Sequence, residues 1–262
     1  MTEMRAVLKA LLLALHVLAG FLIAHVAMQL PRYQSQWEKL VAHWYAALLS
    51  IMNVHLNVRG ESHAGVCLRA SNHVSWLDVP VLGVLGMGSF VAKSEIARWP
   101  VFGRMAQTTQ TVFIVRGAYR TRETIEEMKH RLCEGRSVLF FPEGTTGEGR
   151  DLLKFYPRLF AAAIESGVPV QPVSLSYARS DGAYDAIPFV DDEAFLPHLW
   201  GLLKLPRIEV DVSFAHAVTA VSDRLRKPVS ADARATIAGC LAETPKTGHT
   251  DIADLLASEA GC

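Results

Sequence analysis

The sequence has few cysteines and carries no net charge. Its four cysteines stand far apart in 262 residues, without the CxxC or CxH spacing of a zinc site, and are typical of unpaired thiols in a reducing compartment. Lysine and arginine (26) balance aspartate and glutamate (26), so no overall positive field favours nucleic acid. The chain also lacks HExxH or a comparable ligand spacing. We therefore expect neither a metal nor another cofactor.

Charge is also missing from residues 10–30, which form one long apolar run. About 20 such residues are needed to cross a bilayer core as a helix. Arg5 and Lys9 precede the run and Arg32 and Lys39 follow it, so the positive-inside rule fixes no orientation. A cleaved signal peptide is the alternative, although no clean small-x-small site follows. We expect a membrane-associated helix that either spans the bilayer or lies in one leaflet.

A second uncharged stretch covers residues 40–54 and is too short to span comfortably. Trp44 and Tyr45 suit the interfacial zone of a membrane. The segment is either partly embedded or an ordinary buried helix packed on the first. Residues 1–54 are thus predicted to be N-terminal membrane-associated helices.

After residue 54, short β-rich runs alternate with helical ones. The predicted strands are residues 54–60, 65–71, 89–93, 111–117, 137–144, 169–177 and 207–215. Helices are expected at 79–86, 119–135 and 158–167. This alternation predicts an α/β fold with a mostly parallel central sheet flanked by helices, over residues 55–243. Residues 244–262 are polar and rich in small side chains, and are expected to be a loosely attached tail.

His73 and Asp78, in "SNHVSWLDVP", are the first candidate catalytic residues. The spacing alone is weak, because His249 and Asp254 repeat it in the tail. Five residues do not share a face of a helix, and in a strand they point to opposite sides, so the two side chains can meet only across a bend. Ser75-x-x-Asp78 also fits a capping box, a structural explanation of Asp78 that is compatible with the catalytic one.

Three further segments end or begin predicted strands. "TVFIVRG" ends on Arg116, "FFPEGTT" ends on residues 142–146, and "VPVQPVSL" begins another strand. Because parallel strands end at one edge of a sheet, His73, Asp78, Arg116 and Glu143 are expected around one crevice. Each segment alone has an ordinary explanation as a loop arginine, a turn or an edge strand. Their joint occurrence, in this order, favours a site.

In these four blocks the sequence resembles the glycerolipid acyltransferases, whose type member is 1-acylglycerol-3-phosphate acyltransferase. "NHVSWLDVP" is similar to their NHx4D block, "VFIVR" to the arginine block, "FPEGTT" to the EGT block and "VPVQPVSL" to the proline block. The resemblance covers about residues 50–180. One departure is Thr146, where the family usually has arginine. The stretches "AKSEIARWPVFG" and "EGTTGEGR" look closer to the branch that acylates lyso-ornithine lipid.

The resemblance implies a membrane-bound O-acyltransferase that moves an acyl group from acyl-CoA or acyl-carrier protein to a lysolipid hydroxyl. The implied acceptor is 1-acyl-sn-glycerol-3-phosphate, with lyso-ornithine lipid as the alternative. His73 is the implied base and Asp78 its orienting partner, since an imidazole can take a proton at neutral pH. The implied substrate-binding residues are Lys93, Arg116, Glu143, Gly144, Thr145 and Thr146. The implied location is the cytoplasmic membrane, with the catalytic domain in the cytoplasm.

Two other classes of protein stay open at this point. A membrane esterase would use Ser71 or Ser75 as nucleophile, but the sequence lacks GxSxG and both serines lie within two residues of His73. A non-catalytic lipid-binding protein would use the His73–Asp78 segment only as a helix start.

Backbone N–H groups near residues 71–73 or 143–145 are the expected oxyanion donors of the acyltransferase.

Overall fold

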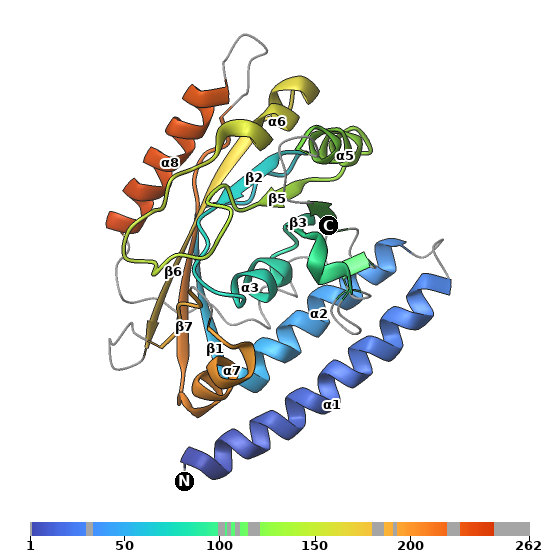
Figure 1. Ribbon diagram of the computed structural model, residues 1–262, viewed down its shortest axis with the longest axis vertical. Helices are drawn as coiled ribbons and strands as arrows, with labels where there is room; N and C mark the ends of the chain where they lie inside the picture. The colour runs from blue at the N-terminus through green and yellow to red at the C-terminus, as the bar shows by residue number, and fades with distance from the viewer. Residues whose placement is uncertain are drawn as a thin grey trace.

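The computed structural model describes residues 2–29, 34–98, 103, 106–107, 111–114, 121–179, 186–190, 193–218 and 226–243. Two long helices, α1 (Thr2–Gln29) and α2 (Gln34–Met52), lie beside each other and precede an α/β domain (Figure 1). The predicted tail at 244–262 and the pair His249–Asp254 lie outside the described residues.

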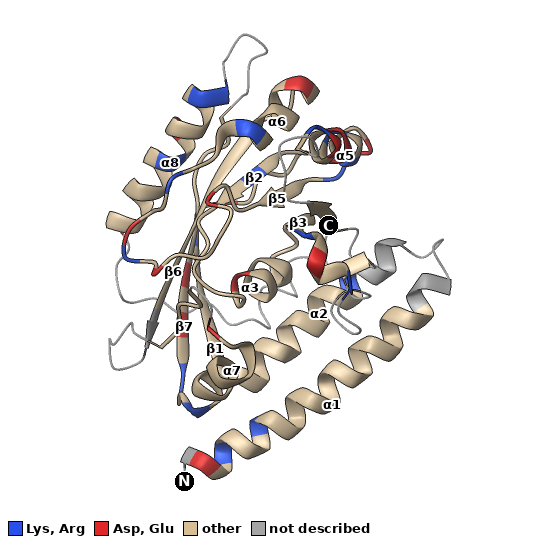
Figure 2. Cartoon of the chain, in the orientation of Figure 1, with Lys and Arg blue, Asp and Glu red and all other residues tan. Residues whose placement is uncertain are grey.

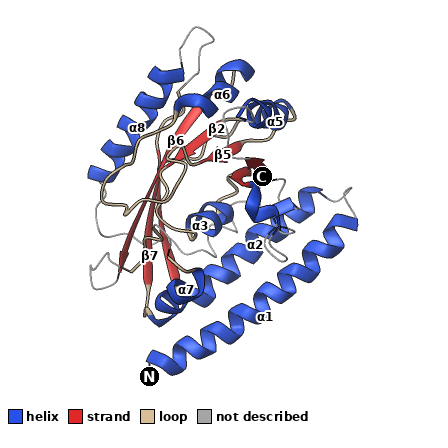
Figure 3. Cartoon of the chain, viewed as in Figure 1, coloured by secondary structure: helices blue, strands red, loops and turns tan. Residues whose placement is uncertain are grey.

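The centre of the domain is a single seven-stranded sheet (Figure 3). Its strands are β1 (Val54–Arg59), β2 (Leu68–Ser71), β3 (Ser89–Lys93), β4 (Val112–Ile114), β5 (Val138–Phe140), β6 (Val170–Arg179) and β7 (Ile208–Phe214). The order across the sheet is β1-β7-β6-β2-β5-β3-β4. All of these pairings are parallel except that of β6 with β7. The predicted mostly parallel α/β sheet is therefore confirmed, with each strand inside or close to its predicted range.

Helices cover the sheet and divide the core into two parts. They are α3 (Asp78–Val84), α5 (Thr121–Cys133), α6 (Ala161–Ser166), α7 (Phe195–Lys204) and α8 (Arg226–Ala242), with 3-10 turns η2 (Ser94–Arg98) and η3 (Pro157–Phe160). One core joins α2, α3 and α7 to Leu139, Val173 and Leu175, whereas the other joins α5, α6 and α8 to Val138 and Phe140. Because successive strand residues point to opposite faces, Leu139 and its two neighbours supply both cores.

The helix α1 presents a leucine-rich face to the outside. Leu8, Leu11, Leu15 and Leu22 are all more than half exposed, and charge is confined to the first third of the helix (Figure 2). Its length and composition suffice to cross a membrane. The opposite face is tied to the domain, since Lys9 Nζ donates to the carbonyl oxygens of Met52 and Leu205, both at 3.1 Å. An apolar outer face of this size indicates membrane association.

The helices α7 and α8 were not predicted from the sequence. Both carry recognisable signals: Pro197 and Pro228 stand in their first turns, and Val229, Ala233 and Ile237 recur at helical spacing on the buried face of α8. The helix α7 packs beside the N-terminal half of α1 (Figure 1) and contacts the bend between β2 and α3 through His198 and Trp76.

Candidate active site

The site is built on the bend that joins β2 to α3. The strand ends at Ser71 and the helix begins at Asp78, with residues 72–77 between them. Asn72 fixes this bend to β6, because its side-chain amide donates to the Leu175 carbonyl at 2.9 Å and its side-chain oxygen accepts from the Leu175 N–H at 2.8 Å. The strand–bend–helix geometry expected from the sequence is present.

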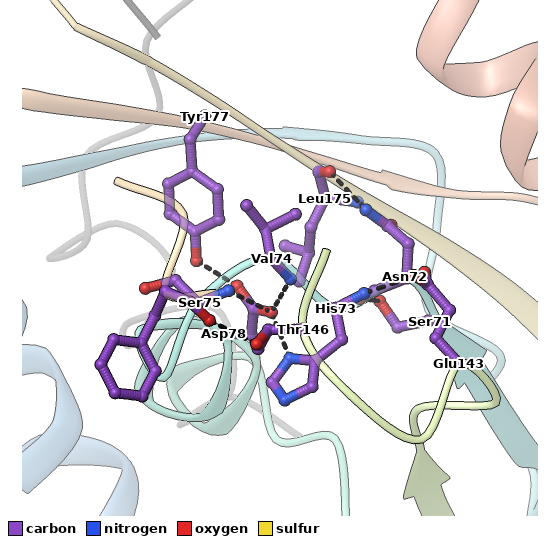
Figure 4. A network of polar contacts seen from close by, with 11 residues as sticks. Ser71, Asn72, His73, Val74, Ser75, Asp78, Glu143, Thr146, Leu175 and Tyr177 are labelled. Atoms are coloured by element: carbon purple, nitrogen blue, oxygen red, sulfur yellow. Dashed lines mark hydrogen bonds and ion pairs between the residues drawn. The ribbon is translucent and has the colours of Figure 1, made fainter. Parts of the chain in front are cut away.

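His73 and Asp78 meet across this bend. His73 Nδ1 lies 2.6 Å from Asp78 Oδ2, and the carboxylate is fully buried while the imidazole is 19% exposed. A carboxylate only accepts hydrogen bonds, so Nδ1 carries the hydrogen and Nε2 of the neutral ring holds a free lone pair. Figure 4 shows the second ring nitrogen pointing away from the network. One face of the ring stacks on Phe141, with centroids 3.9 Å apart and planes inclined by 11°.

The Asp78 carboxylate is saturated by donors. Oδ2 also accepts from the backbone N–H groups of Val74 (2.7 Å) and Ser75 (3.1 Å), and Oδ1 accepts from the Tyr177 hydroxyl at 2.6 Å. The predicted capping box forms only in part, since Asp78 reaches back to the Ser75 N–H but the buried Ser75 hydroxyl has no hydrogen-bond partner in the described part of the chain. The hydroxyl makes no cap bond because α3 begins only at Asp78, with Leu77 in the N-cap position. Asp78 therefore serves the helix start and the imidazole together.

Glu143 supports His73 from the loop after β5. Its Oε1 accepts the His73 N–H at 3.2 Å and its Oε2 accepts the Leu153 N–H at 3.3 Å. Glu143 is only 4% exposed, and this burial raises the pKa of its carboxyl group, although the two N–H donors act in the opposite direction. With both oxygens bonded to the protein backbone, Glu143 acts as a brace.

The rest of the 143–146 loop surrounds His73 on the same side. Gly144 has a φ of 71°, a left-handed conformation that favours glycine and turns the chain sharply after Glu143. Gly144 and Thr145 are exposed, and the N–H of Gly147, just after the loop, donates to the His73 carbonyl at 2.8 Å. The Thr146 hydroxyl donates to the Phe189 carbonyl, which commits its hydrogen to the fold.

Of the two remaining sequence-predicted residues, the structure describes only Lys93. Lys93 ends β3 and is exposed, and β5 separates its strand from β2, which places the two strands about 10 Å apart. Arg116 lies outside the described residues, two positions after the end of β4. The structure thus brings His73, Asp78 and the 143–146 loop together, with Lys93 on the same carboxyl edge of the parallel strands.

Sequence reasoning missed a layer of support behind the loop. Trp76 Nε1 donates to His198 Nδ1 at 3.1 Å, and His198 Nε2 lies 3.2 Å from the Pro188 carbonyl. The next residue, Phe189, donates its N–H to the Val74 carbonyl at 3.0 Å. The short segment 186–190 therefore connects α7 with both site loops. No local pattern around His198 points to this role.

Comparison with known proteins identifies the family of this chain. The Acyltransferase family model matches residues 54–176. The chain is 40% identical to lyso-ornithine lipid O-acyltransferase of Pseudomonas aeruginosa over 182 residues, which is 69% of this chain and 70% of the relative. The chain belongs to the acyltransferase family. It is also 36% identical to 1-acyl-sn-glycerol-3-phosphate acyltransferase of Neisseria gonorrhoeae over 200 residues, or 72% of this chain and 77% of that one.

The fold of this acyltransferase is similar to a solved structure. The crystal structure of the 1-acyl-sn-glycerophosphate acyltransferase PlsC from Thermotoga maritima superposes with a TM-score of 0.68, covering 94% of this chain and all of that one, at 22% identity. The matched family region spans β1 to most of β6, and it contains every described residue of the His73–Asp78 network up to Leu175. Tyr177 falls just beyond it.

Proposed function

We propose that this acyltransferase uses His73 as a general base to move an acyl group from a thioester to the hydroxyl of a lysolipid. The observation that carries this proposal is the buried Asp78 carboxylate, which holds the hydrogen on Nδ1 and leaves Nε2 as a proton acceptor on the exposed side. A base oriented in this way suits attack by an alcohol.

In the proposed reaction the acceptor oxygen attacks the thioester carbonyl carbon while Nε2 takes the hydroxyl proton. The tetrahedral intermediate then expels the thiolate, which receives that proton from the imidazolium. Asp78 stabilises the imidazolium between the two steps. The new ester bond replaces the thioester bond, and no covalent bond to the protein is formed.

Two of the backbone N–H groups expected to bind the oxyanion already have other acceptors. The His73 N–H is bonded to Glu143, and the Gly144 N–H donates to the Phe141 carbonyl at 3.1 Å, so both are committed within the fold. We assign the oxyanion contact to the exposed Thr145 N–H, which has no acceptor among the described residues. Lys93 and Arg116 are the proposed cations for the acceptor head group. Gly144 and Thr146 then shape the wall of that pocket, and Glu143 braces it.

Two acceptors fit these residues. The first is 1-acyl-sn-glycerol-3-phosphate, whose phosphate would bind Arg116 and Lys93. The second is lyso-ornithine lipid, which is favoured by Thr146, because its hydroxyl bonds to Phe189 where the family usually offers a guanidinium. The name of the Pseudomonas aeruginosa relative supports the second acceptor, and that of the Neisseria gonorrhoeae relative supports the first.

Both acceptors and products are lipids, so the apolar face of α1 keeps the enzyme where its substrates are. We propose that the chain lies on the cytoplasmic membrane with residues 55–243 in the cytoplasm. There it meets acyl-CoA or acyl-carrier protein as the donor, with residues 1–54 as the membrane-associated part and 244–262 as a tail.

The test uses the full-length chain in mixed micelles. Palmitoyl-CoA or palmitoyl-acyl-carrier protein is supplied with either lysolipid or with none, and products are identified by mass spectrometry. The proposal expects ester product with at least one lysolipid, no thioester loss without an acceptor, and a loss of roughly 10²–10⁴ in rate for His73→Ala. Thioester hydrolysis without a lysolipid, or a His73→Ala variant with most of its activity, would refute it.

A further inference from the structure

Among the described residues, the Asp78 carboxylate has one partner that comes from outside its own loop. Three donors on Oδ2 belong to residues 73–75, whereas the donor on Oδ1 is the hydroxyl of Tyr177 on β6, 99 residues away in the sequence. We propose that Tyr177 is a positioning residue that sets the orientation and the charge of the Asp78 carboxylate, and through it the proton affinity of His73. This inference rests on the proposed role of His73 as the base.

The position of Tyr177 follows from the register of β6. Ser71, the last residue of β2, pairs with Val173, so Tyr177 extends four residues beyond the end of β2, alongside the bend. Val173, Leu175 and Tyr177 share one face of the strand and join the core that contains Val74 and Leu77. The Asn72 amide bonds to both backbone groups of Leu175. Asn72, the residue before His73, therefore lies level with Leu175, two residues before Tyr177.

Two-point fixation is the geometric part of the proposal. A carboxylate held only at Oδ2 can still turn about its Cβ–Cγ bond, which moves Oδ2 relative to the imidazole. The phenol bond to Oδ1 at 2.6 Å (Figure 4) removes this freedom, and Tyr177 itself is only 1% exposed. Oδ2 is then kept in place for the His73 N–H before any substrate binds.

The electrostatic part concerns how strongly the imidazole retains a proton. A donor on Oδ1 draws negative charge away from Oδ2 and so weakens the attraction of Asp78 for the imidazolium. Among the described residues, the other titratable groups facing the pair are Glu143, bonded to the His73 N–H, and His198, which lies behind Trp76. Neither bonds to the Asp78 carboxylate, so the phenol can be altered without disturbing their contacts.

The experiment compares Tyr177→Phe with Tyr45→Phe in the full-length enzyme. Both changes remove one phenol hydroxyl from a ring that packs near α3, and the Tyr45 ring lies over Gly83, near the end of that helix. We measure kcat and KM for the acceptor from pH 5 to 9, together with the melting temperature. For Tyr177→Phe we expect kcat to fall roughly tenfold, KM to stay within about twofold, and the acid limb of the pH profile to move to higher pH.

The direction of the shift separates positioning from packing. Without the phenol, Oδ2 carries more charge and the imidazole keeps its proton to higher pH, whereas a packing defect lowers activity and melting temperature without moving the limb. An unmoved limb, with or without loss of activity, overturns the inference. If Tyr177→Phe unfolds, Tyr177→Met takes its place in the same profile, because its flexible apolar side chain also lacks a donor for Asp78 and does not titrate.

A double-mutant cycle provides the second test. If the phenol acts through Asp78, Tyr177→Phe changes the rate little once Asp78→Asn is present, because the carboxylate that it tunes is gone. A full additional loss in the double variant overturns the inference. His73→Ala separates this result from failure of the proposed function. A fully active His73→Ala variant refutes the base itself, whereas an inactive one with an unshifted Tyr177→Phe profile refutes only the role of Tyr177.

Discussion

Arg234 on α8 binds the backbone of Leu153, which in turn is hydrogen-bonded to Glu143. Its Nε donates to the Leu153 carbonyl at 3.0 Å and its Nη2 donates to the Leu152 carbonyl at 2.6 Å. The N–H of Leu153 is bonded to Glu143 Oε2, and Glu143 Oε1 is bonded to the His73 N–H. A hydrogen-bonded chain thus connects an exposed helix with the proposed base.

Removing this clamp is expected to affect the site from a distance. For Arg234→Ala we predict faster hydrogen exchange of the Leu153 amide and a loss of roughly two- to tenfold in kcat, because the brace on His73 loosens. Arg226→Ala removes the same charge from the start of the same helix and is the control. Unchanged exchange at Leu153 in the Arg234 variant would contradict the connection.

Glu143 gives the protein a specific dependence on pH. Burial raises its folded-state pKa above the ordinary value of 4.5, so the folded protein keeps this proton to a higher pH than the unfolded chain does. Ionisation of Glu143 therefore subtracts stability as pH rises above about 4.5 toward the raised value. A glutamine side chain does not ionise, and its amide nitrogen cannot accept a hydrogen bond. Glu143→Gln therefore loses one of the two hydrogen bonds from the His73 and Leu153 N–H groups at every pH.

The expected result is a stability difference that shrinks as pH rises. We predict that the advantage in melting temperature of the wild type over Glu143→Gln is largest near pH 4.5 and declines above it. Glu148→Gln, an exposed change in the same loop, is the control, and thermal denaturation at several pH values is the measurement. A difference that grows with pH would mean that burial does not dominate the environment of Glu143.

Thr146 offers a test of acceptor choice. Thr146→Val keeps the shape but removes the bond to the Phe189 carbonyl, which should cost about 1 kcal/mol of stability and leave the preference between acceptors unchanged. Thr146→Arg introduces the guanidinium usual in the family, and we expect it to raise kcat/KM for 1-acyl-sn-glycerol-3-phosphate relative to lyso-ornithine lipid several-fold. An arginine variant with the same preference as the valine variant would exclude a phosphate contact at this position.

The exposed face of α1 should determine membrane binding. Replacing Leu11 and Leu15 by glutamate places two charges on the apolar face, at 60% and 65% exposed positions, and should shift the protein from the vesicle pellet to the supernatant in a sedimentation assay. Ala231→Glu adds charge to an exposed position of α8 and should leave sedimentation unchanged. Equal sedimentation of both variants would place the membrane contact elsewhere.

The sequence allowed the sheet and the centre of the site to be predicted because their signals are local. Alternation of apolar residues marked the strands, and the six residues from His73 to Asp78 form one short bend whose partners are neighbours in the chain. The brace through Glu143 could be placed at the right sheet edge, but its bonds to His73 and Leu153 depend on the exact turn at Gly144, which composition does not specify.

The outer partners could not be found in this way. Tyr177 reaches Asp78 from a strand 99 residues away, and Trp76 reaches His198 across 122 residues. Such contacts follow from the register of β6 against β2 and from the packing of α7, neither of which a local pattern encodes. The alternation that places Tyr177 on the same face as Val173 and Leu175 was visible, but only the pairing of Ser71 with Val173 shows which residue lies level with the carboxylate.

The stack between Phe141 and His73 limits the path of the incoming alcohol. One broad side of the imidazole is covered by a parallel benzene ring, and the Asp78 side of its rim is filled. If His73 is the proposed base, the lipid hydroxyl arrives in the plane of the imidazole, along the Nε2 lone pair, and passes the uncovered face or rim of the ring. A larger or tilted side chain at position 141 would change that angle of approach without removing any atom that takes part in the chemistry.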